Sequence, residues 1–408
     1  MSARQAIFSA LYAYEKKGSY IEDELLNWGE PDDKNRRLAR QVASGVIRRD
    51  ASLTYLIHQL QPKLKISAKA MIILKMAIYQ HYFMDRVPDY AIISESIVLA
   101  KKLLPLALQK LLYALLKKME KISFSLPQDD SSESLVSRLS YPLEFIQLVT
   151  GTYGLNKTKY ILNAMNSTFP TTFRVRKSQD LPKGHFEKIG NFGWDFYQLT
   201  SMDSVSSFAN LPNVYIQNPT PAYLFHELSK SLFSPPLSVL DLCAAPGGKT
   251  LMAAECFEKA KIVCNDISSN KIALLKSNIE KYDLPVQITN YDATEYPDKE
   301  KFDLIILDAP CSNSGVLNKR VEARWRLTEQ NMTNHTQLQK KMLQRAIKLL
   351  SDQGVIFYLT CSIIPFENEK LMQEIALQES MKVLKEMLIL PDEKGMDGGF
   401  GCALIKKH

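Results

Sequence analysis

The second half of the chain alternates short apolar segments with amphipathic ones, and this alternation restricts the fold more than any other feature of the sequence. The apolar segments are 237–243, 261–266, 286–292, 302–310 and 354–361, and the segments with helical spacing between them are 248–257, 268–282 and 328–350. Near-continuous apolar strands separated by helices are typical of a parallel, doubly wound sheet covered on both faces. We therefore predict an α/β domain over residues 216–408.

The turn after the first predicted strand is the first candidate binding element. Ligands of such sheets bind at the carboxyl ends of the strands. The residues at this end are Cys243, Ala244, Ala245, Pro246, Gly247, Gly248 and Lys249. The turn is not a P-loop, because Cys243 stands where that motif requires its first glycine, and it is not a GxGxxG motif either. What remains is a small-residue turn that opens a helix, where backbone N–H groups can receive an anionic group.

Acidic residues follow three further predicted strands. They are Asp266, Asp292 and Asp308, which stand at the ends of these predicted strands, and each alone would also suit an ordinary loop or cap. Together they surround the glycine-rich turn, and an acid after the second strand suits a ribose diol. S-adenosylmethionine offers a ribose, an adenine amino group and a methionine carboxylate. We therefore predict this cofactor, with Asp266 at the ribose, Asp292 near the adenine and the turn at the methionine end.

The six cysteines all lie in the same half of the chain, with none before Cys243. They form no Cys-x-x-Cys pair and no Cys/His ligand spacing, so we predict no metal site. A lone buried cysteine usually behaves as a small apolar side chain, which is our interpretation of Cys256, Cys264 and Cys402. Cys311 and Cys361 differ, because both directly follow predicted strands beside the cofactor turn. Two thiols there suit a nucleophile and a proton-handling group.

The first third of the chain has a different character. Helical spacing of apolar residues is found at 34–50, 68–83, 90–104 and 108–118, and no alternating strand pattern occurs there. Asp32 or Asp33 and Ser67 are candidate N-caps. We predict an all-α domain over 1–125, followed by a linker and a small α+β connecting region over 126–215.

Charge is concentrated in this helical third. Its net charge is +8, whereas 126–215 is neutral and 216–408 carries −1. One helix holds or adjoins the basic residues Lys34, Arg36, Arg37, Arg40, Arg48 and Arg49. Such a cluster is either a solvated helix face or a phosphate-contacting surface, and the uncompensated charge favours RNA contact. No apolar stretch is long enough to cross a bilayer and the start lacks signal-peptide architecture, so we expect a cytoplasmic protein without a membrane partner.

Three motifs carry a resemblance to a known family. They are VLDLCAAPGGKT at 239–250, DAPCSNSG at 308–315 and TCSIIPFEN at 360–368. These motifs resemble the RNA 5-methylcytosine methyltransferases of the RsmB/NOP/Sun group. The segments RQAIFSALYAYE, RLARQVASGVIRR and VPDYAIISESIVLAKK are similar to a NusB-type RNA-binding domain. The resemblance covers essentially the whole chain. It implies a NusB-like helical domain joined to a class I, Rossmann-like methyltransferase domain.

The resemblance also implies roles for individual residues. Residues 243–249 with Asp266, Asp292 and Asp308 would bind S-adenosylmethionine. Cys361 would attack C6 of a cytosine, Cys311 would help to release the product, and Asp308 would also steady the base. The chemistry needs the thiol because cytosine C5 is too electron-poor to accept a methyl group until a thiolate has added to C6. The implied substrate is structured RNA, most simply small-subunit (16S) ribosomal RNA, and nothing in the sequence demands more than a monomer.

Three other functions stay open at this point: methylation of transfer RNA, methylation of DNA, and a non-catalytic RNA assembly role. The chain also departs from the family pattern in three segments. Ser312-Asn313-Ser314-Gly315 replaces Ser-Gly-Thr-Gly, Lys319–Trp325 lacks the usual Pro-Asp before its tryptophan, and Gln217-Asn218-Pro219-Thr220 replaces Gln-Asp-x-Ser. The target RNA is therefore less firmly predicted than the reaction.

Overall fold

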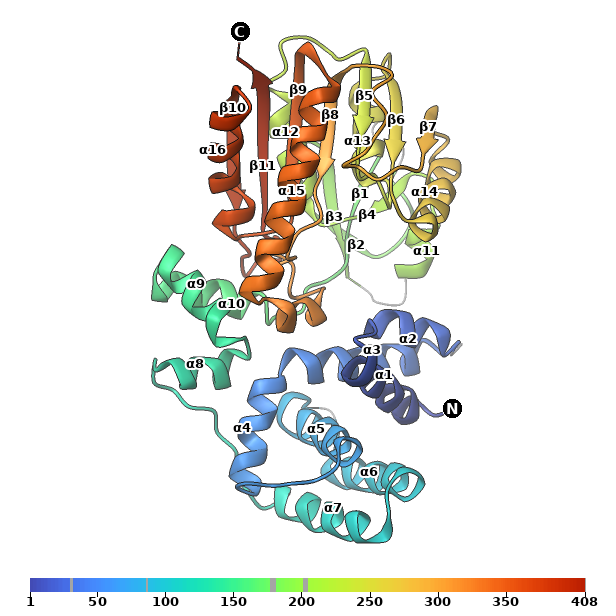
Figure 1. Ribbon diagram of the computed structural model, residues 1–408. Helices are drawn as coiled ribbons and strands as arrows, with labels where there is room; N and C mark the ends of the chain where they lie inside the picture. Colours follow the sequence, from blue (N-terminus) through green and yellow to red (C-terminus); the bar gives the residue numbers. More distant parts are fainter. Residues whose placement is uncertain (30–31, 86, 177–180, 201–204, 408) are drawn as a thin grey trace. The chain divides into compact units, whose positions relative to one another are not determined.

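The structure is a computed structural model that describes residues 1–29, 32–85, 87–176, 181–200 and 205–407. The chain divides into two compact units (Figure 1). The first comprises Met1–Asn166 together with Asn318–Arg326, and the second comprises Ser167–Leu317 together with Leu327–His408. The segment 126–215, predicted as one connecting region, contributes to both units.

The first unit is helical in its described residues, as the spacing predicts. Its elements are α1 (Ala3–Lys17), α2 (Ile21–Asn27), α3 (Asp33–Arg48), α4 (Asp50–Leu60), α5 (Ala68–Phe83), α6 (Asp89–Leu103), α7 (Leu106–Met119), α8 (Ser132–Leu139), α9 (Leu143–Tyr153), α10 (Leu155–Ala164) and the 3₁₀ helix η2 (Val321–Arg326). Both predicted caps are present, because the side chains of Asp32 and Ser67 accept hydrogen bonds from Lys34 N and Ala70 N. These bonds satisfy amide groups that have no partner within the helix.

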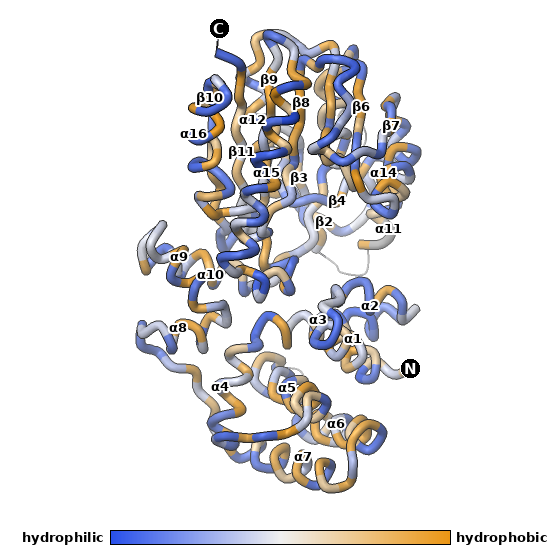
Figure 2. The backbone as a smooth tube through the Cα atoms, viewed as in Figure 1, coloured by the Kyte–Doolittle hydropathy of each residue, from blue (hydrophilic) through white to orange (hydrophobic). Residues whose placement is uncertain are grey.

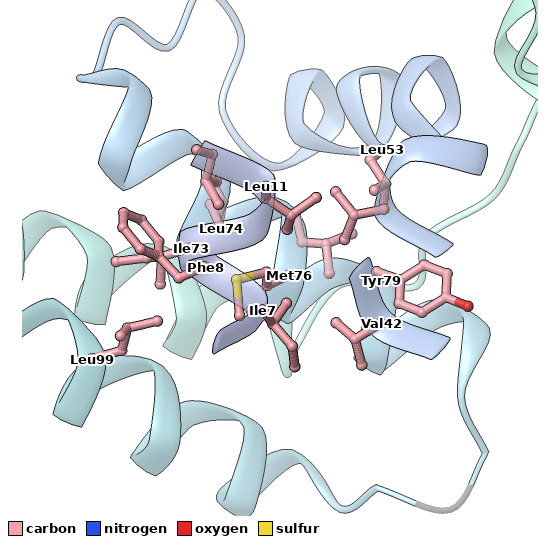
Figure 3. Packing of buried hydrophobic residues seen from close by; sticks show 14 of the residues in the cluster. Ile7, Phe8, Leu11, Val42, Leu53, Ile73, Leu74, Met76, Tyr79 and Leu99 are labelled. Carbon is pink, nitrogen blue, oxygen red and sulfur yellow. The ribbon is translucent and has the colours of Figure 1, made fainter. Parts of the chain in front are cut away.

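Apolar side chains from the first helices share one core (Figure 3). The labelled residues come from α1, α3, α4, α5 and α6, and they are Ile7, Phe8, Leu11, Val42, Leu53, Ile73, Leu74, Met76, Tyr79 and Leu99. All are buried. Removing that much apolar surface from water is the main stabilising contribution to a bundle of this kind.

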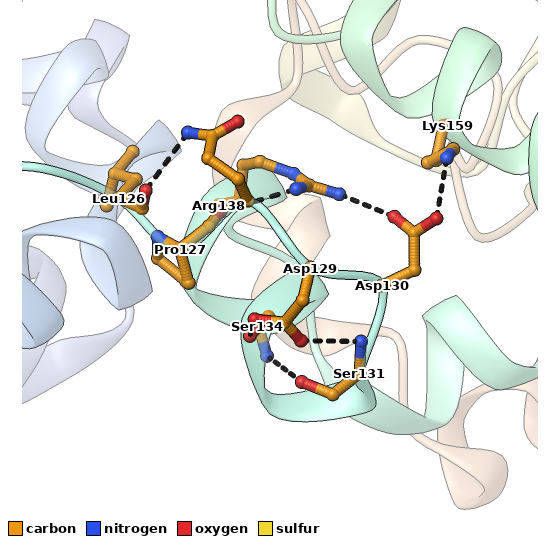
Figure 4. Close-up of polar contacts among 9 residues, drawn as sticks. Leu126, Pro127, Asp129, Asp130, Ser131, Ser134, Arg138 and Lys159 are labelled. Atoms are coloured by element: carbon orange, nitrogen blue, oxygen red, sulfur yellow. Dashed lines mark hydrogen bonds and ion pairs between the residues drawn. The ribbon is translucent and has the colours of Figure 1, made fainter.

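The Ser/Asp-rich segment predicted as a linker is held by polar contacts (Figure 4). Asp129 accepts hydrogen bonds from Ser131 N and Ser134 Oγ, and these bonds lower its pKa to about 2. Asp130 pairs with Arg138 on α8 at 3.0 Å and with Lys159 on α10 at 2.9 Å. The segment therefore caps α8 and links it to α10.

A segment from the second half of the chain completes the helical unit. Arg324 of η2 is fully buried. It donates hydrogen bonds to the carbonyls of Arg48 and Ser140, to Asn166 Oδ1 and to the Tyr141 hydroxyl. Its guanidinium also lies over the Tyr141 ring, 3.9 Å from the centroid. Burial lowers the pKa of Arg324 to about 10, so the group is still charged at neutral pH.

The neighbours of Arg324 in η2 also contact the helices. Trp325 Nε1 donates to the carbonyl of Ile47 at 2.8 Å, and Glu322 accepts from the backbone N–H of Ile21 at 2.8 Å. The departure of Lys319–Trp325 from the family pattern therefore falls in a segment that is part of the helical core.

The second unit contains two sheets and their helices. Its elements are β1 (Thr172–Val175), β2 (Phe186–Asn191), β3 (Asp195–Leu199), α11 (Val205–Ala209), β4 (Val214–Ile216), α12 (Pro219–Ser229), β5 (Ser238–Asp241), α13 (Gly248–Cys256), β6 (Lys261–Asn265), α14 (Ser269–Tyr282), β7 (Val286–Thr289), β8 (Phe302–Asp308), α15 (Glu329–Leu349), β9 (Leu350–Thr360), the 3₁₀ helix η3 (Pro365–Glu367), α16 (Glu369–Gln378), β10 (Met381–Ile389) and β11 (Gly399–Lys406). The smaller sheet has the order β2-β3-β1-β4, and its strands are antiparallel. The strands β1, β2 and β3 lie within the segment 126–215, which was predicted to be α+β.

The larger sheet has the order β10-β11-β9-β8-β5-β6-β7. The five strands predicted from the apolar segments pair in parallel. Two strands at the carboxyl end of the chain, β10 and β11, were not predicted, and they extend the sheet with antiparallel pairing. In this order, β6 and β7 lie on one side of β5, whereas β8 and β9 lie on the other side. The switch point at which such sheets bind ligands is therefore at β5.

Helices cover both faces of the larger sheet. Alternate residues of β8 point to opposite faces: Ile305 packs with α15 and α16, and Leu304 packs with α12 and α13. The colouring by hydropathy shows apolar residues along β8 and β9 and alternating polar and apolar turns along α15 (Figure 2). This is the burial that a doubly wound sheet requires.

The buried guanidinium of Arg324 yields a test of the helical unit. Arg324→Ala leaves several buried acceptors without a donor. Each buried acceptor that loses its hydrogen bond costs about 1–3 kcal/mol. We expect the free energy of unfolding to fall by about 3 kcal/mol in urea denaturation followed by circular dichroism. Arg326→Ala is the matched control, because Arg326 makes exposed contacts with Gly18 and Tyr20. Equal effects of the two variants would contradict the anchoring role of Arg324.

Candidate functional site

The turn after β5 is shaped by a buried carboxylate and by a glycine. Asp241 ends β5, is fully buried, and accepts a hydrogen bond from Thr250 Oγ1 at 2.7 Å. Its other oxygen, Oδ1, is buried without a hydrogen-bond partner. Gly247 has φ 111°, a conformation that favours glycine, and it places the N-terminus of α13 at the end of β5. The turn therefore brings the N-terminal end of α13 close to a carboxyl oxygen that has no hydrogen-bond partner.

The predicted acids follow β6 and β7 closely. Asp266 accepts hydrogen bonds from Ala245 N at 3.3 Å and Ser268 N at 3.1 Å. It therefore connects the turn 243–249 to the end of β6. Asp292 accepts from the backbone N–H and the hydroxyl of Thr294, at 2.8 and 2.7 Å. Both carboxylates are thus held in position by their own loops.

Asn265 is a buried residue of this region that the sequence analysis did not identify. Its amide donates to the carbonyls of Leu242 and Tyr291 and accepts from Thr289 Oγ1 and Tyr291 N. It joins the carboxyl ends of β5, β6 and β7. A polar residue at the end of an otherwise apolar strand is the signal that would have found it.

The clustering of carboxylates alters the protonation of this region. Burial raises the pKa of Asp241 to about 7, and the charge of Asp308 adds to the effect. Burial and then the charges of Asp241, Asp308 and Asp266 raise the pKa of Cys243 well above its ordinary value. Cys243 is therefore a neutral thiol in the wall of the turn, and these carboxylates lie close enough to influence one another.

Lys249 and Asp308 form an ion pair that joins the turn 243–249 to the end of β8. Although burial opposes the charged form, Asp308 and Asp241 raise the pKa of Lys249 above its ordinary value. Lys249 is therefore an ammonium group at neutral pH. The pair lines a small cavity together with Thr220, Thr360, Cys361 and Asp397.

The structure brings the two predicted cysteines together. Cys311 follows β8 and Cys361 follows β9, and their Sγ atoms lie 3.2 Å apart. Cys361 is partly exposed and Cys311 is buried. The hydrogen bond to Cys361, then burial, raises the pKa of Cys311 well above its ordinary value, so Cys311 is protonated at neutral pH. A thiol beside a second, accessible sulfur is an arrangement that suits nucleophilic chemistry.

A buried carboxylate holds the loops that carry these cysteines. Glu367 of η3 is fully buried and accepts from Ser312 N at 2.8 Å and Ser312 Oγ at 2.5 Å. It also accepts from the hydroxyl of Ser362. Ser312 and Ser362 are the residues that follow Cys311 and Cys361. The sequence analysis quoted Glu367 within a motif without giving it a role, although an acid in the apolar run after β9 was a usable signal.

The remaining predicted site residues are placed as follows. Cys264 and Cys402 are buried and Cys256 is half-buried, as expected for side chains without a role in the site. Arg48 is buried and donates to the carbonyl of Asn318, so it is not presented to RNA, which corrects the prediction for this residue. Arg49 is half-buried, with its guanidinium 5.1 Å from the centroid of the Phe83 ring.

The other basic residues lie on or beside the first half of α3. Lys34, Arg36 and Arg40 are exposed, and Arg37 is half-buried. Arg36 pairs with Asp33, and Arg40 pairs with Glu22 at 2.7 Å. Exposed ion pairs of this kind contribute little stability, so a phosphate can compete for these guanidinium groups.

Two kinds of feature are not found in the described part of the chain. It contains no cluster of His, Cys, Asp and Glu that could hold a metal ion. None of its helices is long and apolar enough to span a membrane.

Comparisons with known proteins match the two units separately. The family described as "16S rRNA methyltransferase RsmB/F" matches residues 235–404, and the NusB family matches residues 1–123. The Ribosomal RNA small subunit methyltransferase B of Vibrio cholerae is 26% identical and covers 100% of this chain and 98% of its own length.

Solved structures have the same fold. The crystal structure of PH0851 has a TM-score of 0.79 at 22% identity and covers 99% of this chain and 98% of its own. The structure of NSun6 from Pyrococcus horikoshii with SFG has a TM-score of 0.53 at 18% identity, covering 65% of this chain and 98% of its own.

The raised pKa of Asp241 predicts how stability depends on pH. The folded protein keeps a proton on Asp241 up to about pH 7, whereas the unfolded chain releases it near the ordinary value of 3.8. The folded state therefore binds the extra proton between these values, and Asp241 destabilises the fold progressively as pH rises through this window. Relative to Asp241→Asn, we expect wild-type protein to lose about 1.4 kcal/mol of unfolding free energy per pH unit.

The measurement is urea denaturation of both proteins at pH 5 and pH 8 without ligand. Asp352→Asn is the control, because Asp352 is largely exposed. If wild type and Asp241→Asn show the same pH dependence, the carboxyl of Asp241 does not carry the buried proton.

Proposed function

We propose that this methyltransferase modifies carbon 5 of a cytosine in small-subunit ribosomal RNA, because residues 235–404 match the family described as 16S rRNA methyltransferase RsmB/F and residues 1–123 match the NusB family. Cys361 is the nucleophile and S-adenosylmethionine is the methyl donor. The observation that carries the proposal is the 3.2 Å separation of the Cys311 and Cys361 sulfurs beside the Lys249–Asp308 pair.

The turn after β5 fits S-adenosylmethionine. The unpartnered Oδ1 of Asp241 can accept from the methionine ammonium, and the start of α13 can receive the carboxylate. Asp266 lies at the end of β6, where a carboxylate suits the ribose hydroxyls, and Asp292 follows β7 on the adenine side. NSun6 from Pyrococcus horikoshii, which has a similar fold, was crystallised with SFG, an analogue of this cofactor. When bound, S-adenosylmethionine supplies an electrophilic methyl group.

Cys361 supplies the electrons that cytosine C5 lacks. Cys361 is partly exposed and lines the same cavity as Lys249 and Asp308. Addition of the thiolate to C6 forms a carbon–sulfur bond and makes C5 nucleophilic. Asp308 can accept from the amino group of cytosine while Lys249 holds the carboxylate in place. The base must leave its stack to reach this site, at a cost of a few kcal/mol.

Release of the product requires that the C5 proton is removed and that the C6–S bond breaks. The electron pair of the C5–H bond then restores the C5–C6 double bond as the Cys361 thiolate leaves. Cys311 is protonated in the resting site mainly because of its hydrogen bond to Cys361. That cause disappears when the Cys361 sulfur is bonded to C6, so Cys311 gives up its proton to water more easily. The Cys311 thiolate can then accept the C5 proton.

The helical unit is the proposed site of RNA capture. Lys34, Arg36 and Arg40 provide exposed positive charge on one helix, and the first 125 residues carry a net charge of +8. Phosphate contacts from such a surface can offset the cost of extracting the target base. Arg48 contributes to the packing of the unit instead.

The roles of the two cysteines predict different outcomes for their removal. Cys361→Ala cannot form the C6 bond, so methyl incorporation into RNA should be abolished while cofactor binding stays unchanged. Cys311→Ala should trap the intermediate as an RNA–protein band that survives a denaturing gel. Cys256→Ala is the control, because Cys256 lies outside the cysteine pair. Activity in Cys361→Ala, or normal turnover in Cys311→Ala, would overturn the assignment.

The target RNA is tested in cells. Bisulfite mapping of ribosomal and transfer RNA from cells with and without the protein should show one cytosine of small-subunit RNA that loses its modification. Loss at a transfer RNA cytosine would contradict the ribosomal target. Unchanged modification in both RNAs would favour a non-catalytic assembly role.

A further inference from the structure

Asn313 lies in the loop that follows Cys311, at a position where the resembled family has glycine. Its backbone has φ 60°, in the left-handed region that glycine occupies without strain. Asparagine is the side chain that most readily replaces glycine in this conformation. The loop therefore keeps its backbone path and gains a polar side chain.

The side-chain amide of Asn313 bridges the two cysteine-bearing loops. Its Nδ2 donates to the carbonyl of Cys311 at 3.1 Å, and its Oδ1 lies 3.3 Å from Cys361 Sγ. The orientation of the amide follows from the first contact, because a carbonyl only accepts and the nitrogen must face it. The oxygen of Asn313 is therefore directed at the sulfur of Cys361.

An amide oxygen in this position distinguishes between the two forms of the sulfur. A thiol can donate its hydrogen to Oδ1, whereas a thiolate has no hydrogen and would face a partly negative oxygen. Other groups near Cys361 act in both directions. The ammonium of Lys249 favours the thiolate, Asp308 opposes it, and the Cys311 thiol can donate to either form.

We propose that Asn313 is a positioning residue that holds Cys361 as a thiol in the absence of RNA and must release it before the sulfur attacks. The inference rests on the proposed role of Cys361 as the nucleophile. A member of the family with glycine at this position lacks the restraint. This chain should consequently protect its reactive sulfur better against alkylation and oxidation between catalytic cycles.

The test is the rate at which iodoacetamide alkylates Cys361 in the full-length protein without RNA. Peptide mass spectrometry after digestion reports Cys361 separately from the other cysteines. Asn313→Gly removes the acceptor without straining the backbone, so we expect alkylation at neutral pH to be several-fold faster. Asn313→Asp keeps the size of the side chain and adds a negative charge, so we expect alkylation to be at least about tenfold slower at neutral pH and to recover at alkaline pH.

The control is Asn334→Asp, which makes the same charge change on the exposed surface of α15. It should alkylate at the wild-type rate. Aspartate and asparagine are nearly equal in size, and recovery of the rate at alkaline pH separates an effect of charge on the sulfur from blocked access to it. A wild-type rate in Asn313→Asp, or a slower rate in Asn313→Gly, would overturn the inference.

The same variants separate this inference from the proposed function. Alkylation needs neither RNA nor S-adenosylmethionine. If the rates change as expected but the wild-type protein methylates no RNA, the restraint on Cys361 stands and the proposed reaction fails. If wild type methylates RNA and Asn313→Asp alkylates at the wild-type rate, the reaction stands and the restraint fails.

Discussion

The geometry of the site depends on the buried carboxylate of Glu367. Cys311 and Cys361 come from loops fifty residues apart in sequence, and a polar group in the protein interior is stable only when it is hydrogen-bonded. Ser312 and Ser362 supply those bonds, each from the position directly after a cysteine. Satisfying Glu367 therefore draws the two loops together and sets the separation of the two sulfurs.

Buried carboxylates also surround the turn 243–249, but their hydrogen bonding there is incomplete. Burial, and then the charges of Asp241, Asp308 and Asp266, raise the pKa of Cys243, and Lys249 forms an ion pair with Asp308 in this group. Oδ1 of Asp241 is also buried without a hydrogen-bond partner. Buried acceptors without partners reduce stability, and a cationic ligand relieves them. The region is thus less stable than it would be with these acceptors satisfied, and a bound cationic group would restore that stability.

Sequence reasoning could find the five parallel strands and their ends from their apolar runs, but it missed β10 and β11. It located Asp266, Asp308 and both site cysteines through their positions after strands. It could not show that Arg324 belongs to the helical unit, since nothing local marks a segment that leaves one core to complete another. Arg48 was predicted to contact RNA for the same reason: a basic residue on a helix looks alike whether it faces solvent or a buried carbonyl.

The loop after Cys311 shows why a departure from a motif need not change a backbone. Replacing glycine by Asn313 is tolerated because φ 60° lies where asparagine can also reside, and Ser314 keeps a hydroxyl that contacts Ser362 at 2.9 Å. Gly315 is retained, and a Cβ there would lie 2.7 Å from the backbone of Gly398. The loop is thus restricted most strictly where backbones meet. At Asn313 the restriction concerns only backbone conformation, so the side chain there is free to act on the neighbouring sulfur.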